Sequence, residues 1–184
     1  CTLNTDAVIG SAGNPNTVDL TFANDPNYDG TGATNHNQPE DDQKKGKTPE
    51  DTNIVFTYEF DVDKVDENNQ ALTGAGFKLY KYNASSTATD KWEVVKVDAS
   101  GKVSSNGNEE IKPASGNTFK WIGLDDGEYK LVESTTPSGY NTMTPVEFTV
   151  TATHTQDSDT NPLKLTSLTA TTKETLPQSY STLS

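Results

Sequence analysis

Two ionisable side chains, those of Lys64 and Glu133, break the polarity pattern of the segments that contain them. In "VFTYEFDVDKV", residues 55–65, apolar and polar residues alternate, and Lys64 has the same parity as the aromatic residues. In "DDGEYKLVES", residues 125–134, Glu133 has the same parity as the tyrosine and leucine before it. Because alternate side chains of a strand point to the same face, both groups are expected to point into a core.

The chemistry that such a pair could perform depends on its burial. An unpaired buried charge is costly, so burial favours the neutral forms, a free amine and a protonated carboxylic acid. A neutral lysine is a nucleophile, and a protonated glutamic acid can polarise a carbonyl group. With an asparagine carboxamide as third member, the product would be an amide cross-link, formed with loss of ammonia inside an apolar shell that excludes water. The alternative is that both side chains reach solvent at a sheet edge or form an ordinary buried ion pair.

The composition of the 184-residue chain favours an extended β protein over an enzyme with a large core. Apolar residues make up 30%, the formal net charge is -13, and 13 Gly and 9 Pro suit short strands joined by turns. The negative charge argues against a nucleic acid as partner, because phosphate contacts need clustered Lys and Arg. No apolar run is long enough to span a bilayer and no signal peptide is visible, so we expect a mature region or a fragment.

Disulfide, metal and cofactor chemistry find little support in the sequence. The one cysteine, Cys1, excludes a disulfide within the chain and a zinc site built from several cysteines. His36 and His154 lie in polar segments and are expected to be solvated loop residues. The oxygen-rich segments "NDPNYDG" and "DSDTN" leave a calcium site open, although neither follows the EF-hand loop pattern. We therefore predict no cofactor and no metal site.

Strand signals follow one another at short spacing from Asn53 onward, and no segment has convincing helical periodicity. The candidate strands are "NIVFTYEFDVDKV", "GAGFKLYKY", "KWEVVKV", "NTFKWIGL", "DDGEYKLVES", "TPVEFTVTA" and, more weakly, "PLKLTSLTA". Short strands separated by turns in this way predict an all-β, Ig-like β-sandwich. Upstream, Asn16, Val18, Leu20 and Phe22 share one face of a strand that is expected to point inward, and a long segment rich in Asn, Asp, Gly and Pro then predicts a loop or linker.

Two longer motifs carry a resemblance to a known family. "FDVDKVDENNQALTGAGFKLYK" and "GLDDGEYKLVESTTPSGY" are similar to the Cna B-type domain of Gram-positive surface proteins, over residues 53 to about 152. In that family a lysine of the first strand forms an intramolecular isopeptide bond, helped by the glutamate of the pilin E-box. The resemblance places Lys64 at the lysine position and Glu133, in "YKLVESTTPSGY", at the position of the glutamate that catalyses the bond.

The N-terminal part resembles the junction between two domains of sortase-polymerised backbone pilins. In that interpretation residues 1–23 are the last strand region of a preceding isopeptide domain, residues 24–52 are a linker, and residues 53–184 are the Cna B-type domain. Asn16 would then be the cross-linked asparagine of the preceding domain, with its lysine partner outside this chain. The alternative is that Asn16 is an ordinary polar residue at the start of a strand.

The sequence departs from the family where the asparagine partner of Lys64 should lie, in the last strand. The tail contains no asparagine after Asn161, which looks like a turn residue. Either the final strand is missing from this chain, the interpretation that we favour, or a residue such as Thr171 or Thr172 replaces the asparagine and no bond forms. A pairing of Lys64 with Asn16 is disfavoured, because the family places lysine in the first strand and asparagine in the last.

The resemblance implies a structural function, that of a shaft subunit in a covalently polymerised pilus that is extracellular and anchored to the cell wall. Its partners would be neighbouring pilin subunits and a pilus-specific sortase, and the protein would not be an enzyme, because each cross-link forms once. "LPQSY", residues 176–180, resembles the sorting motif LPxTG, but Ser179 and Tyr180 replace its Thr-Gly, so we take it as coincidence. The lysine that joins subunits is expected upstream.

The sequence leaves two alternative functions open. An adhesin stalk or host-matrix-binding surface module could use Trp92 and Trp121, although core packing explains both more simply. A hydrolase could use Asp125 and Asp126, but "LDDGEY" predicts a turn with solvated carboxylates.

Overall fold

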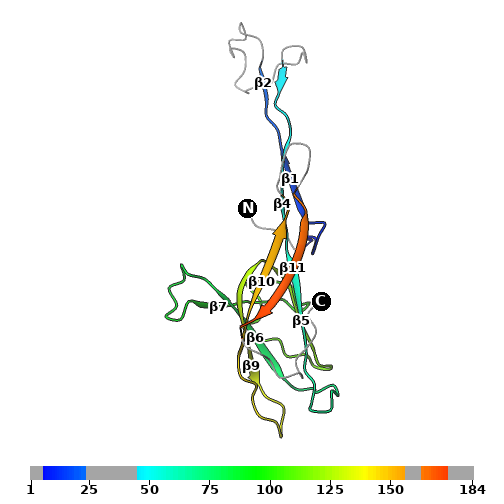
Figure 1. Ribbon diagram of the computed structural model, residues 1–184, viewed down its shortest axis with the longest axis vertical. Helices are drawn as coiled ribbons and strands as arrows, with labels where there is room; N and C mark the ends of the chain where they lie inside the picture. The colour runs from blue at the N-terminus through cyan, green and yellow to red at the C-terminus, as the bar shows by residue number, and fades with distance from the viewer. Residues whose placement is uncertain (1–5, 24–44, 156–162, 174–184) are drawn as a thin grey trace. The chain divides into compact units, whose positions relative to one another are not determined.

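The structure is a computed structural model that describes residues 6–23, 45–155 and 163–173 (Figure 1). The chain divides into two compact units. Unit 1 comprises Cys1–Asn14, Phe56–Thr155 and Lys164–Ser184, and unit 2 comprises Pro15–Val55 and Gln156–Leu163. The described residues form strands, turns and loops without a helix, and they therefore contain no helix long and apolar enough to cross a membrane.

Unit 1 contains a five-stranded antiparallel sheet and a separate strand pair. The sheet has the order β11-β10-β9-β6-β7, and the pair is β5-β8. The bounds of the sheet strands are β6 Gly76–Tyr82, β7 Trp92–Val94, β9 Gly127–Thr135, β10 Val146–His154 and β11 Leu165–Thr172, and those of the pair are β5 Tyr58–Asp63 and β8 Thr118–Leu124. β10 and β11 run side by side in Figure 1, joined by a register from Phe148↔Thr172 to His154↔Leu165.

The core of unit 1 lies between the five-stranded sheet and the β5-β8 pair. Phe60 of β5 stacks on Phe148 of β10 with ring centroids 4.6 Å apart, and Phe119 of β8 meets Phe77 of β6 edge-on at 4.7 Å. Trp121 on β8 is completely buried. Two layers with an aromatic core between them confirm the predicted all-β sandwich.

A glycine-rich turn leads from β8 into β9. Gly123 and Gly127 have φ angles of 96° and 140°, values that L side chains rarely adopt, so glycine is needed at both positions. The turn sets the start of β9 and, with it, which side chains of β9 face the core. Tyr129, Leu131 and Glu133 are buried and the residues between them are not, so the alternation expected from the sequence is observed.

The described residues of unit 2 form two short strand pairs, of which β2-β3 is antiparallel. β1 (Asn14–Val18) pairs with β4 (Asp51–Val55), and β2 (Thr21–Ala23) pairs with β3 (Lys45–Lys47). The segment predicted as a linker, residues 24–52, therefore contains strand residues in its described part.

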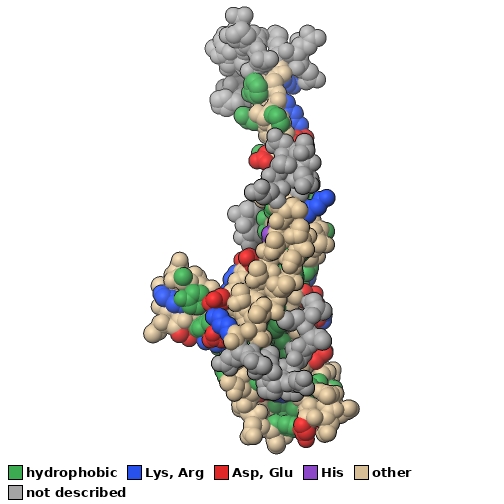
Figure 2. Space-filling view, in the orientation of Figure 1, with side chains coloured by type: hydrophobic (Ala, Val, Ile, Leu, Met, Phe, Trp, Pro, Cys, Tyr) green, Lys and Arg blue, Asp and Glu red, His purple; other side chains and the backbone are tan. Residues whose placement is uncertain are grey.

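The apolar face of unit 2 does not point inward as the sequence led us to expect. Val18, Leu20 and Phe22 are 60%, 61% and 45% exposed, and Asn16 is exposed as well. Figure 2 shows hydrophobic side chains at the surface around β2. The alternation identified which residues share a face, but nothing in the described part of unit 2 covers that face.

A buried lysine and glutamate form the candidate functional site

Lys64 follows the last residue of β5, and its backbone is held in place by neighbouring segments. Its N–H donates to the carbonyl of Asn117 at 2.8 Å, and its own carbonyl accepts from the Asn117 side-chain amide at 2.9 Å and from the N–H of Leu72 at 3.0 Å. The Lys64 side chain is 10% exposed. The strand parity predicted this direction, and three hydrogen bonds fix it.

Glu133 approaches from the facing sheet. It lies on β9 opposite Phe77 of β6, on the side of the sheet that faces the core, and its side chain has no exposed surface. The structure brings the two predicted residues together: the Nζ atom of Lys64 lies 3.0 Å from Oε1 of Glu133.

The two oxygens of Glu133 have different neighbours. Oε2 accepts a hydrogen bond of 2.6 Å from the backbone N–H of Met143, in the loop that joins β9 to β10. Oε1 makes no hydrogen bond of normal geometry among the described residues, and its close polar neighbour is the Lys64 amine. The sequence could not have identified Met143, because the group that matters is a backbone N–H, which every residue except proline carries.

The two groups have little exposed surface, and two protonation forms of the pair are chemically relevant there. Charged, the two groups form a buried ion pair, whose attraction offsets the cost of removing both charges from water. After transfer of one proton they become a neutral amine beside a carboxylic acid, which are the nucleophile and the proton donor that an amide-forming reaction needs. What remains to be supplied is a carbonyl electrophile.

β5, which ends just before Lys64, is paired along one side in the described part of the chain. In the part of the chain that the structure describes, β8 is the one strand paired with β5. A small cavity of about 100 Å³ lies between β5 and β11, and its lining is mainly apolar, with Tyr58, Phe60, Val150 and Leu168 among the lining residues. The sequence of β11, "LTSLTATT", supplies no asparagine to this edge.

Comparison with known proteins identifies the family. Residues 58–164, more than half of the chain, match the SpaA prealbumin-like fold domain. The chain belongs to this family. The matched residues include β5 with Lys64 and β9 with Glu133, so both members of the buried pair lie within the SpaA domain.

The relatives of this SpaA domain protein include pilus components. It is 28% identical over 144 residues to the trypsin-resistant surface T6 protein of Streptococcus pyogenes serotype M6, an alignment that covers 77% of this chain and 22% of that protein. The structure of the T6 backbone pilin of serotype M6 S. pyogenes matches 99% of this chain and 41% of its own, with 22% identity and a TM-score of 0.50. A pilus adhesin of Streptococcus pneumoniae matches more weakly, with 19% identity, a TM-score of 0.39 and coverage of 75% and 16% of the two chains.

These comparisons confirm the predicted resemblance to Gram-positive backbone pilins and the predicted fold. The chain spans about a fifth of the length of the curated relative and less than half of the solved backbone pilin. The T6 protein is named as a surface protein and the T6 structure as a backbone pilin, which are structural roles.

Among the described residues, none of the asparagine and threonine partners that the sequence suggested lies at Lys64. Asn16 lies on β1 and is exposed, and its proposed lysine is outside the chain, so its role stays a prediction. Asn161 lies outside the described residues. Thr171 and Thr172 are paired with Thr149 and Phe148 of β10, and neither is among the polar contacts of Lys64.

Several other predicted side chains have local structural contacts. The prediction that His154 is a solvated loop residue is wrong: it ends β10, its ring contacts that of Phe56 at a tilt with centroids 4.6 Å apart, and its Nε2 lies 3.2 Å from the Tyr58 hydroxyl. His36 lies outside the described residues. The Asp125 carboxylate pairs with Lys81, which argues against the hydrolase alternative.

Metal binding finds no support in the part of the chain that is described, since no three potential ligand side chains gather there. Both oxygen-rich segments considered for calcium, residues 24–30 and 157–161, lie outside the described residues.

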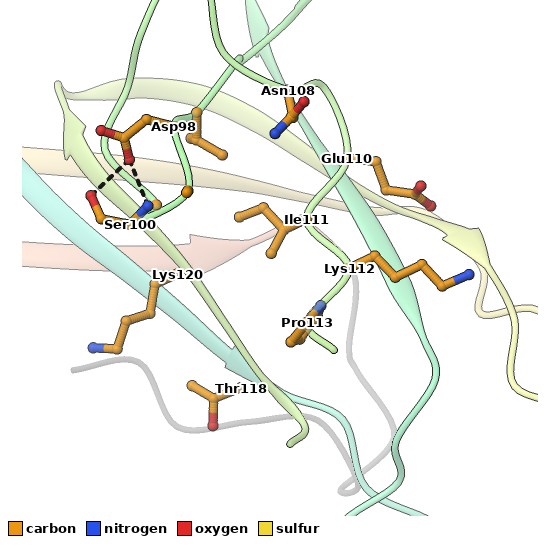
Figure 3. A pocket seen from close by; sticks show the side chains of 12 residues that line it. Asp98, Ser100, Asn108, Glu110, Ile111, Lys112, Pro113, Thr118 and Lys120 are labelled. Atoms are coloured by element: carbon orange, nitrogen blue, oxygen red, sulfur yellow. Dashed lines mark hydrogen bonds between the residues drawn. The ribbon is translucent and has the colours of Figure 1, made fainter. Parts of the chain in front are cut away.

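A wider surface hollow of about 320 Å³ lies beside the turn at residues 98–101 (Figure 3). Three of its four charged side chains, those of Asp98, Glu110 and Lys120, have hydrogen-bond partners within the protein. Hydrogen bonds from Ser100 lower the pKa of Asp98, those from the hydroxyls of Thr135 and Ser134 lower the pKa of Glu110, and the carboxylates of Glu59 and Asp61 raise the pKa of Lys120 to about 12. Because their hydrogen bonds are made within the protein, these groups do not form a candidate site.

Proposed function

We propose that the chain is the C-terminal part of a shaft subunit of a covalently polymerised surface pilus, stabilised by an autocatalytic isopeptide bond at Lys64. The observation that carries the proposal is the buried Lys64–Glu133 contact of 3.0 Å inside a SpaA-type domain. The chemistry occurs once in each molecule, so the protein is a structural component and not an enzyme.

The proposed reaction joins the Lys64 amine to an asparagine carboxamide. The neutral amine attacks the carboxamide carbon, a new C–N bond forms, and the original C–N bond breaks to release ammonia. Glu133, as a carboxylic acid, gives its proton to the carboxamide and takes one from the attacking nitrogen, so that the amide nitrogen leaves as ammonia, protons and charge balance, and Glu133 ends unchanged. The apolar surroundings favour the neutral reactants and keep water from competing for the carbonyl.

The asparagine would arrive on a further strand beside the open edge of β5. A free strand edge presents unpaired backbone groups that a neighbouring strand can satisfy. A strand placed there would bring its side chains close to the end of β5, where Lys64 lies. In this proposal that strand follows β11 in the sequence and belongs to the same domain. It would be the final strand of the domain that residues 53–184 otherwise form.

Such a bond would stabilise the fold covalently, as disulfides do in other secreted proteins. The chain has a single cysteine, so it cannot form an internal disulfide. A covalent link from Lys64 to a strand beyond Ser184 closes a loop of more than 120 residues (184 − 64), which in the chain-entropy description destabilises the unfolded state by about 5 kcal/mol. In the assembled pilus the other partners would be neighbouring subunits and a pilus-specific sortase, with Asn16 completing the cross-link of the preceding domain and the assembly anchored to the cell wall.

Mass spectrometry tests this proposal directly. We expect this chain alone to have its unmodified mass, with Lys64 in a normal tryptic peptide, whereas a longer form that includes the following strand should be short by one ammonia. In that form Lys64 should be found joined to an asparagine peptide, and a matched Lys64→Met variant should have its full mass. A longer form that keeps its full mass and an unlinked Lys64 would refute the isopeptide bond.

A second candidate, an adhesin stalk or host-matrix-binding module, is favoured by the aromatic residues on the outer face of the β6-β7 hairpin. Tyr82 is 40% exposed and meets the Trp92 ring edge-on, and the Lys130 ammonium lies 4.5 Å from the centroid of the Trp92 ring. Trp121 cannot contribute, because it is completely buried. Binding of the chain to immobilised matrix proteins that is lost in a Trp92→Ala variant would favour this function.

A further inference from the structure

Glu133 meets two different polar groups through its two oxygens. The N–H of Met143 lies 2.6 Å from Oε2, while the Lys64 amine lies 3.0 Å from Oε1. Counted as whole residues, Met143 and Glu133 are 7% and 4% exposed, so water has little access to the two carboxyl oxygens of Glu133. A hydrogen bond to a carboxyl group in such surroundings is stronger than one in water.

In the protonated form of Glu133 that the proposed reaction uses, the Met143 contact determines which oxygen carries the proton. A carboxylic acid has one hydroxyl oxygen and one carbonyl oxygen, and a backbone N–H is best accepted by the carbonyl oxygen. The N–H therefore favours the form in which Oε2 is the carbonyl and Oε1 bears the hydroxyl. Oε1 is the oxygen that faces Lys64, so the proton is held where the amine can exchange it.

We propose that Met143 is a positioning residue of the cross-linking site, acting through its backbone N–H. It fixes the orientation of the Glu133 carboxyl group and confines proton exchange with Lys64 to Oε1. This inference deepens the proposed function and rests on it for its chemical purpose, but the contact itself can be tested without any cross-link.

The loop that presents Met143 is held by its own contacts. The hydroxyls of Thr136 and Thr142 lie 2.8 Å apart, and the N–H of Tyr140 donates to the carbonyl of Pro137 at 3.2 Å. The Thr136–Thr142 contact joins the start of the loop to the residue before Met143. Loss of this contact should loosen the loop and weaken the hydrogen bond to Glu133, although neither threonine touches the carboxyl group.

Nuclear magnetic resonance of the chain tests the contact. We expect the Met143 amide proton to lie downfield and to exchange slowly, and a Glu133→Ala variant to move it upfield. In Thr136→Val it should exchange roughly twofold to tenfold faster, the loss expected for one hydrogen bond between neutral groups, and the carboxyl carbon signal of Glu133 should shift. The matched control is Thr144→Val in the same loop, an exposed position, which should change neither signal.

The Met143 amide signal and the Glu133 carboxyl signal decide whether Met143 positions Glu133. An unprotected Met143 amide, or one that does not respond to Glu133→Ala, would overturn the inference, as would a Glu133 carboxyl signal that is the same in Thr136→Val and in the native chain. Faster exchange of the Met143 amide in Thr136→Val with an unchanged carboxyl signal would show a looser loop that does not position Glu133.

The reaction provides a second measurement in the longer form that carries the following strand. Thr136→Val should slow the loss of ammonia roughly tenfold to a hundredfold, and Thr144→Val should not. If no form of the protein loses ammonia, the proposed function fails, while the amide and carboxyl signals still decide whether Met143 positions Glu133. Formation of the cross-link at the same rate in the unsubstituted longer form and in its Thr136→Val and Thr144→Val variants would refute the positioning role of Met143 while supporting the cross-link itself.

Discussion

Replacing Glu133 by alanine should destabilise unit 1 by removing the partner of a buried amine. The Glu133 side chain has no exposed surface and the Lys64 side chain is 10% exposed, so Lys64 could not reach bulk water without moving. Loss of one member of a buried ion pair typically costs about 3–5 kcal/mol, because the other charge is left uncompensated. With a urea m-value of about 2 kcal/mol/M, this lowers the unfolding midpoint by roughly 1.5–2.5 M.

Urea unfolding followed by tryptophan fluorescence measures this effect, since Trp121 lies in the core. The matched control is Glu109→Ala, which removes the partner of Lys78 from a contact of 3.2 Å between partly exposed side chains and should change the midpoint little. The double variant Lys64→Met/Glu133→Leu should recover most of the loss, because apolar residues of similar volume often replace a buried ion pair without penalty. A Glu133→Ala variant as stable as the control would refute the burial argument, and a double variant no more stable than the single one would show that the pair itself stabilises the fold.

Two further predictions concern residues outside the pair. Gly101→Ala should destabilise the chain more than Gly116→Ala: both glycines have φ near +90°, but a Cβ at 101 would lie 2.6 Å from the Lys120 carbonyl oxygen while one at 116 meets nothing within 4 Å, so thermal unfolding should separate the two variants. Hydrogen bonds from Thr135 and Ser134 lower the pKa of Glu110 below its ordinary value of 4.5, so they stabilise the fold above that pH and their contribution is lost as the pH falls through the lowered pKa. Thr135→Val should therefore reduce the urea midpoint at pH 7 and have less effect at pH 2, and an equal effect at both would contradict this assignment.

The strand parity of the sequence predicted the direction of Lys64 and Glu133 but not their contact. Parity depends only on the local geometry of each strand, and it was sufficient to place both side chains on inner faces. The 3.0 Å approach depends on how the β5-β8 pair packs against the larger sheet, which is set by the aromatic core between them. That packing has no signature in either strand alone.

Local pattern was insufficient where the surroundings decide the outcome. The alternation pattern predicts that Val18 and Leu20 point inward, yet both are exposed. The prediction fails because alternation shows which residues share a face but not whether another element covers that face. His154 was assigned to a loop for its polarity, although it has the parity of Phe148 and Val150. Its ring packs on Phe56 at the end of β10, a contact that only the folded chain reveals.

The buried pair and the open edge of β5 each make sense in the presence of the other. A buried ion pair gives little net stability compared with apolar residues of the same size, so stability alone does not account for Lys64 and Glu133. In the described part of the chain β5 is paired on one side alone, next to a small and mainly apolar cavity, and an unpaired strand edge does not stabilise the domain either. A strand docked beside β5 would pair with that edge and, in the proposed reaction, bring a carboxamide towards Lys64. The proposed final strand would therefore account for both features, which is why the reaction partner is sought on that edge.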